Sequence, residues 1–124
     1  AVFITTGITS QIALEAINFL NSNNLKIGLV HLHTIKPLDS GYLKNLFNSV
    51  KFAVVVEEHS VVGGLGSAIL EFVNDYSIKD IRIKRIGIPD KFVEKYGTQD
   101  TLLKHLKIDR DNLIDSMKKL LENN

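Results

Sequence analysis

Strand-like and helix-like segments alternate along most of this 124-residue chain. Short runs rich in β-branched residues predict strands at residues 2–6, 27–32, 53–56 and 81–86. Apolar residues at helical spacing predict helices between them, at residues 12–20, 39–47 and 65–74. Right-handed crossovers join strands that alternate with helices in this way, so the sheet is parallel. The pattern therefore predicts an α/β fold, a three-layer αβα sandwich around a mainly parallel sheet of four to five strands.

Two of the predicted strands, at 2–6 and 53–56, are apolar nearly throughout. Central strands of a parallel sheet need this composition, because helices bury both of their faces. The strand predicted at 81–86 instead alternates isoleucine with arginine and lysine. We therefore expect one of its faces to meet water.

Two further helices are predicted after the last strand, one beginning at Thr98 and one capped by Asp109. The second carries an apolar stripe at three- and four-residue steps: Leu113, Met117, Leu120 and Leu121. Such a stripe is typical of an amphipathic helix that packs on the body of a domain. Ser10 and Asp39 are placed to cap earlier helices. No linker interrupts the pattern, so residues 1–124 are predicted to form a single domain.

Charge and composition exclude several classes of partner. Lysine and arginine total 15 against 14 acidic residues, and apart from a short basic run at 79–85 they are scattered, so no nucleic-acid partner is predicted. The chain has no cysteine, which excludes disulfides and thiolate metal sites and fits a cytoplasmic protein. No apolar run approaches the roughly 20 residues that span a bilayer, so no membrane association is predicted.

The stretch VVVEEHSVVGGLGSAI, residues 54–69, carries the richest set of polar and glycine residues after any predicted strand. Ligands of a parallel sheet collect beyond the carboxyl ends of its strands, so function is expected there. The free N–H groups at the start of the following helix suit an anion. However, the glycine spacing matches neither the dinucleotide fingerprint nor the nucleotide P-loop. Glycines at such a corner also serve tight turns and close packing, so both interpretations stay open.

Glu57, Glu58 and His59 invite an acid–base interpretation, because a carboxylate can orient a histidine. Adjacent residues of a strand point to opposite faces, so the two glutamates cannot both face one substrate. Ser60 is the nucleophile beside them, and it lacks the spacing of the hydrolase nucleophile elbow. We therefore assign no catalytic residue to this chain.

His31 and His33 are two residues apart on a predicted strand, a spacing compatible with two metal ligands. No third ligand is evident in the sequence. We interpret the pair as structural, with one histidine at the rim of the core, and assign no metal site.

Five segments follow one another in a set order: Thr6-Gly7, HTIKPLD at 33–39, VVVEEHSVVGGLGSAI at 54–69, RIGIPD at 85–90 and YGTQDTLLKHLKID at 96–109. Together they resemble the C-terminal domain of the transketolase-like thiamine diphosphate enzymes over almost the whole chain. This family includes transketolases, some of them split into two subunits, deoxyxylulose-phosphate synthases and the beta subunits of 2-oxo acid dehydrogenases. His59 is more similar to the split transketolases, whereas GIPD is similar in both of the first two groups.

The resemblance implies an enzyme of three domains, of which this chain is the third. The family's ligands for thiamine diphosphate and magnesium, and its catalytic acids, lie in the first two domains, so no cofactor-binding residue is expected here. The third domain is expected to pack against the pyrimidine-binding domain or subunit and to contribute to a homodimer of the parent enzyme, which acts on sugar phosphates. The chain opens AVFITTG without methionine, from which we expect a fragment of a longer polypeptide or a processed one.

The resemblance also assigns an anion or interdomain contact to six residues: Glu58, His59, Gly63, Gly64, Gly66 and Ser67. Our first hypothesis is a structural and assembly domain, not itself catalytic, of an enzyme that transfers two-carbon ketol units between sugar phosphates or makes deoxyxylulose phosphate. A stand-alone module that binds a small anion or regulates another protein is the alternative. A domain that serves mainly in dimerisation is a third hypothesis.

Overall fold

The computed structural model describes residues 1–122 and contains a four-stranded parallel sheet in the order β2-β1-β3-β4. The strands are β1 (Val2–Thr5), β2 (Gly28–His31), β3 (Phe52–Ser60) and β4 (Arg82–Ile88). The predicted α/β fold with a parallel sheet is therefore confirmed.

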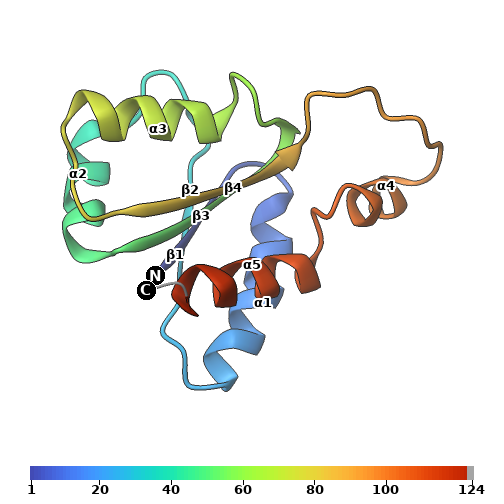
Figure 1. Ribbon diagram of the computed structural model, residues 1–124, viewed down its shortest axis with the longest axis horizontal. Coiled ribbons are helices and arrows are strands. Elements are labelled where there is room, and N and C mark those ends of the chain that lie inside the picture. The colour runs from blue at the N-terminus through green and yellow to red at the C-terminus, as the bar shows by residue number, and fades with distance from the viewer. Residues whose placement is uncertain (123–124) are drawn as a thin grey trace.

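Helices cover both faces of this sheet. They are α1 (Thr9–Ser22), α2 (Ser40–Ser49), α3 (Leu65–Asp75), α4 (Gln99–His105) and α5 (Arg110–Glu122). Figure 1 shows α2 and α3 on one face and α1 and α5 on the other, with α4 beyond the carboxyl end of β4. Within residues 1–122, no helix combines the length and the apolar character needed to cross a membrane.

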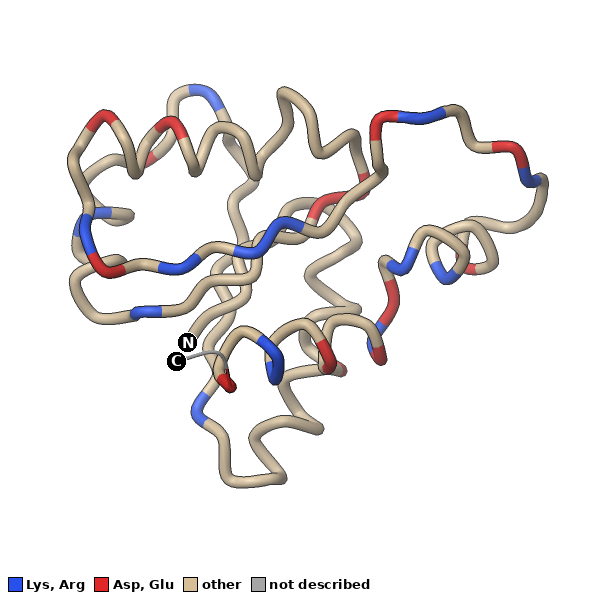
Figure 2. The backbone as a smooth tube through the Cα atoms, in the orientation of Figure 1, with Lys and Arg blue, Asp and Glu red and all other residues tan. Residues whose placement is uncertain are grey.

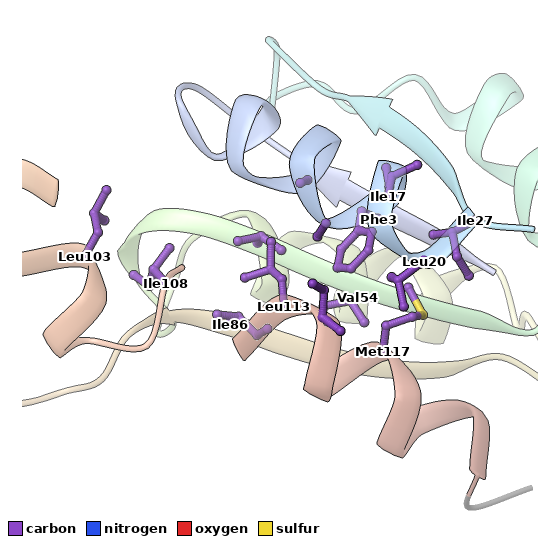
Figure 3. Packing of buried hydrophobic residues seen from close by; sticks show 14 residues of the cluster. Phe3, Ile17, Leu20, Ile27, Val54, Ile86, Leu103, Ile108, Leu113 and Met117 are labelled. Atoms are coloured by element: carbon purple, nitrogen blue, oxygen red, sulfur yellow. The ribbon is translucent and has the colours of Figure 1, made fainter. Parts of the chain in front are cut away.

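The two central strands, β1 and β3, are buried on both faces, as their composition predicts. Phe3 and Val54 point toward α1 and α5, where they pack in one core cluster with Met117 (Figure 3). Ile4 and Val55 point the other way, into the cluster that α2 and α3 cover. This alternation follows from the two-residue period of a strand.

β3 is longer than the sequence predicts, since it continues past Val56 to Ser60. β4 runs beside the extension, and Ser60 pairs with Ile88 after a register shift. The apolar pattern ends at the polar residues 57–59, so it did not predict the extension. β4 itself lies at the edge of the sheet, and Arg82 and Lys84 are exposed as its alternation predicts.

Three of the predicted helix starts are confirmed by capping hydrogen bonds. Asp39, Thr98 and Asp109 each accept a bond from a backbone N–H three residues ahead. The prediction that Ser10 caps α1 is wrong, because the helix begins at Thr9 and its N-cap residue makes no side-chain cap bond. The Ser10 hydroxyl bonds to Thr5 instead, with 2.8 Å between the two oxygens.

Candidate functional site at the carboxyl edge of the sheet

Glu57, near the end of β3, places its carboxylate at the N-terminus of α3. One oxygen accepts a hydrogen bond from Leu65 N at 2.7 Å, and the other accepts one from Gly66 N at 3.0 Å. The residue is only 1 % exposed. These backbone donors have no partner within the helix, and the helix dipole favours a negative charge beside them. The chain therefore supplies its own anion to the glycine-rich corner, which we define as residues 57–67.

The glycine spacing gives that carboxylate room. A Cβ atom at Gly64 would overlap Glu57 Oε2 and would lie 2.7 Å from Ser60 O. A Cβ atom at Gly66 would lie 2.6 Å from Arg85 Cδ. The close approach of Glu57 and Arg85 accounts for both glycines without an external ligand.

Ser67 ties the turn before α3 to the helix itself. Its hydroxyl accepts a bond from Gly63 N at 3.0 Å and donates one to Val61 O at 3.2 Å. Arg85 Nη1 donates to the same carbonyl at 2.9 Å and to Ser67 Oγ at 3.3 Å. The N–H groups of residues 63, 65 and 66 thus all have partners inside the domain. An anion at the glycine-rich corner would compete with these partners, whereas an interdomain contact stays open as a prediction.

Glu57 and Glu58 point to opposite faces of β3, as strand alternation predicts. Glu58 Oε2 accepts a bond from Gln99 Nε2 at 3.4 Å, and a Cβ atom at Gly7 would lie 2.8 Å from Glu58 Oε1. His59 is exposed. The glycines and Ser67 therefore gather around Glu57, while Glu58 reaches toward α1 and α4. Glu57 is thus buried and bonded to α3, on the opposite face of β3 from Glu58.

A second polar cluster, which the sequence analysis missed, lies where β1 and β2 end. Ser10 Oγ is 2.6 Å from His31 Nδ1 and 2.8 Å from Thr5 Oγ1. A serine bonded to a histidine has the first contact of an activated nucleophile. The usual arrangement also needs a third group to orient the histidine. Within the described part of the chain no carboxylate is bonded to His31, so the cluster lacks that group.

His31 and His33 stack on each other, with ring centroids 6.4 Å apart. Both are exposed, so the expectation that one lies at the rim of the core is wrong. Among residues 1–122 no three His, Cys, Asp or Glu side chains are placed to hold a metal ion. The pair is thus a surface feature of the β2 edge.

The connection from β4 to α4, residues 89–98, has neither helix nor strand and projects from the body of the domain (Figure 1). We call this segment the strap. It begins beside the glycine-rich corner, where Val61 N donates to Ile88 O at 2.9 Å, and it ends before Gln99, which donates to Glu58. Within the strap, Phe92 is 95 % exposed and Tyr96 is 101 % exposed.

The strap was not predicted, because the periodic patterns of the neighbouring strand and helix do not extend into residues 89–98. Phe92 and Tyr96 were the available signal, since they lie outside every predicted strand and helix. Exposure of both side chains follows from the path of the backbone, which no local pattern fixes.

Comparison with known proteins gives a consistent family. A family model described as "Transketolase, C-terminal domain" matches residues 1–113. The 1-deoxy-D-xylulose-5-phosphate synthase of Halothermothrix orenii is 37 % identical over 119 residues, which cover 96 % of this chain and 19 % of the synthase. The enzyme of the same name from Geobacillus sp. is 36 % identical over 118 residues, covering 95 % of this chain and 19 % of that enzyme.

A solved structure described as "Split gene transketolase, inactive beta4 tetramer" matches the fold with a TM-score of 0.87 and 29 % identity. The match covers 98 % of this chain and 39 % of the solved chain. This chain therefore spans about a fifth of the length of the curated relatives, while its own length is matched almost completely. With its fold, its ordered motifs and the match over residues 1–113, the chain belongs to the transketolase C-terminal domain family.

Proposed function

We propose that this chain is the C-terminal structural and assembly domain of a transketolase-like enzyme. The parent enzyme transfers two-carbon ketol units between sugar phosphates or makes deoxyxylulose phosphate. Membership of the family and similarity to deoxyxylulose-phosphate synthases support this reaction class. The chain corresponds to 19 % of those synthases, so most of the catalytic machinery belongs to other parts of the parent.

In this proposal thiamine diphosphate and magnesium bind to the other domains of the parent. Bound thiamine diphosphate supplies the electron-withdrawing centre that two-carbon transfer needs. The described residues do not fit the magnesium ion, because magnesium prefers carboxylate oxygens and these residues contain no cluster of three metal-binding side chains. The domain instead supports the subunit or domain that holds the cofactor.

The strap is the single observation that carries the assembly role. Phe92 and Tyr96 are almost fully exposed, and Val93 beside them is 43 % exposed. Large aromatic side chains are enriched in protein interfaces and often dominate their binding energy. A segment that presents two of them to water, next to a buried corner, is typical of a surface that another protein covers.

The area of this surface suits a domain contact. Phe92 and Tyr96 together offer about 300–500 Å² of aromatic surface. A specific interface buries about 800 Å² on each partner, so neighbouring residues must contribute as well. We propose that Glu58, His59 and the exposed Gly63 contribute the additional interface area. They lie at the edge of the glycine-rich corner, beside both ends of the strap.

We propose that the pyrimidine-binding domain or subunit of the same enzyme covers this surface. The curated relatives are about five times as long as this chain, and the remainder must pack somewhere on it. The N-terminus and the end of α5 at Glu122 lie away from the strap (Figure 1). We expect the parent to form a homodimer through the assembled domains.

The test is the double variant Phe92→Ser/Tyr96→Ser in the full-length parent enzyme. We expect assembly, measured by analytical ultracentrifugation, to weaken at least about 30-fold, because an interface hot spot contributes about 2 kcal/mol or more. Ketol transfer should fall with it. Thermal unfolding of the 124-residue chain should not change, since these side chains are exposed in it.

Tyr42→Ser is the matched control, because Tyr42 is an exposed aromatic residue of α2, at 48 %. It should leave assembly and ketol transfer as in the unmodified enzyme. Unchanged assembly in the double variant, with or without a loss of turnover, would refute the role of the strap.

A further inference from the structure

A hollow of about 560 Å³ lies between β4, α5 and the turn that joins α4 to α5. Its lining includes apolar side chains from each of these parts: Ile86, Leu106 and Leu120. Small-molecule pockets usually have volumes of about 300–1,000 Å³ and mostly apolar walls with a few polar groups. The volume is therefore that of a ligand pocket, and these three side chains make part of its lining apolar.

The charge of this hollow is entirely of one sign. Among the described residues that line it, none is acidic and four are basic: Lys84, Arg85, Lys107 and Lys119. Arg85 is engaged by Val61 O and Ser67 Oγ. The three lysines are exposed, and within residues 1–122 none of them has an ion-pair partner. Their charges add to a positive potential that attracts an anion.

Protection of the sheet edge explains only part of this arrangement. Basic residues on an edge strand discourage pairing with another chain, and Figure 2 shows such residues along β4. That function accounts for Lys84 and Arg85. It does not account for Lys107 and Lys119, which reach the hollow from the α4–α5 turn and from α5.

Lys107 also occupies a backbone position that favours glycine. Its φ is 59°, in the left-handed region. Asn112 Nδ2 donates to Lys107 O at 2.6 Å and holds the turn in place. Glycine would adopt this conformation without strain, so the lysine side chain has no advantage for the turn itself.

We propose that this hollow binds a small organic phosphate that carries at least two negative charges and an apolar part. The three lysines meet the phosphate charge, and Ser116, which also lines the hollow, offers a hydroxyl. The apolar residues contact the rest of the ligand. This function goes beyond the assembly role and does not depend on it, since the hollow lies within this domain.

The test is titration of the 124-residue chain with ADP and with inorganic pyrophosphate, followed by calorimetry and by backbone amide shifts. We expect saturable shifts around Gly87, Lys107 and Ser116, with tighter binding of ADP than of pyrophosphate because ADP also uses the apolar lining. The variant Lys84→Gln/Lys119→Gln should weaken ADP binding at least about tenfold, since it removes two charge-assisted hydrogen bonds to the phosphates.

The matched control is Lys104→Gln/Lys118→Gln, which removes the same charge outside the hollow. It should change ADP affinity less than twofold. Lys107→Gly provides a second control on folding, because it should weaken binding while the unfolding temperature stays the same or rises. Equal losses in the two double variants would show non-specific charge attraction and overturn the proposal. Absence of saturable shifts at millimolar ADP would overturn it as well, whatever the outcome for assembly.

Discussion

Glu57 is the residue on which the glycine-rich corner depends. Its carboxylate is buried, and each oxygen accepts a backbone hydrogen bond from the first turn of α3. Hydrogen bonds to a charged group contribute about 1.5–3 kcal/mol each, and an unpaired buried donor costs a similar amount. The Glu57 carboxylate thus stabilises the connection between β3 and α3.

Replacement of Glu57 by glutamine is expected to lower the free energy of unfolding by about 1–3 kcal/mol. The amide keeps one acceptor oxygen, and its NH₂ group then faces a backbone N–H that loses its partner. Urea unfolding of the chain measures the change. Glu58→Gln is the control and should stay within about 0.5 kcal/mol, because Glu58 is a partly exposed residue with one long hydrogen bond, at 3.4 Å. Equal losses at the two positions would contradict the role of Glu57.

Substitution by alanine at either of two neighbouring glycines should lower the stability of the chain, but for different reasons. At Gly64 the new Cβ would overlap Glu57 and crowd Ser60 O, so Gly64→Ala is expected to cost about 3 kcal/mol of stability. At Gly63 the Cβ would meet nothing within 4 Å, and the φ of +75° alone should cost about 1–2 kcal/mol. Thermal unfolding of both variants compares them, and a larger loss at Gly63 would contradict the packing around Glu57.

Part of this corner follows from the sequence and part does not. The opposite directions of Glu57 and Glu58 follow from the period of a strand, and the structure confirms them. The partner of Glu57 lies eight residues further on, beyond a turn whose shape the local pattern does not fix. The bond between Ser10 and His31 joins residues 21 apart, so only the assembled sheet reveals it.

Helix α5 completes the core on one face of the sheet. Leu113 and Met117 are fully buried and pack with residues of β1, β3 and α1 (Figure 3). The prediction that this apolar stripe packs on the body of the domain is therefore confirmed. A helix of 13 residues is only marginally stable alone, so its packing against the sheet and α1 holds it in place.

Met117→Ala is expected to lower the free energy of unfolding by about 2–5 kcal/mol, because it removes a buried side chain and leaves a cavity. Asp115→Ala, on the exposed side of the same helix, should change it by less than about 0.5 kcal/mol. Chemical denaturation of both variants checks the difference. A loss at Met117 no larger than the loss at Asp115 would mean that α5 is not part of the core.

The elements with strong periodicity were predicted well, and the irregular ones were not. The strand and helix patterns gave the parallel sheet, and Asp39, Thr98 and Asp109 marked helix starts because capping uses local contacts. The extension of β3 to Ser60 depends on pairing with β4, which a single strand does not encode. The strap has no period of its own, so its projection from the domain depends on the whole fold.

The domain as a whole satisfies its buried polar groups internally and leaves an aromatic segment exposed. Within residues 1–122, no buried side-chain nitrogen or oxygen lacks a hydrogen bond. In the role that we propose, the exposed strap is a contact surface, and the other domains of the parent enzyme carry out the reaction. This division suits a part of a transketolase-like enzyme that supports the catalytic domains.

Turnover by the 124-residue chain and by the full-length parent enzyme, both supplied with thiamine diphosphate, magnesium and a ketose phosphate donor, tests this division of labour. We expect ketol transfer by the parent enzyme. We expect the chain alone to show no rate above the uncatalysed reaction and no calorimetric binding of thiamine diphosphate. Ketol transfer by the chain alone, abolished by substitution of one of its own residues, would contradict the assembly role.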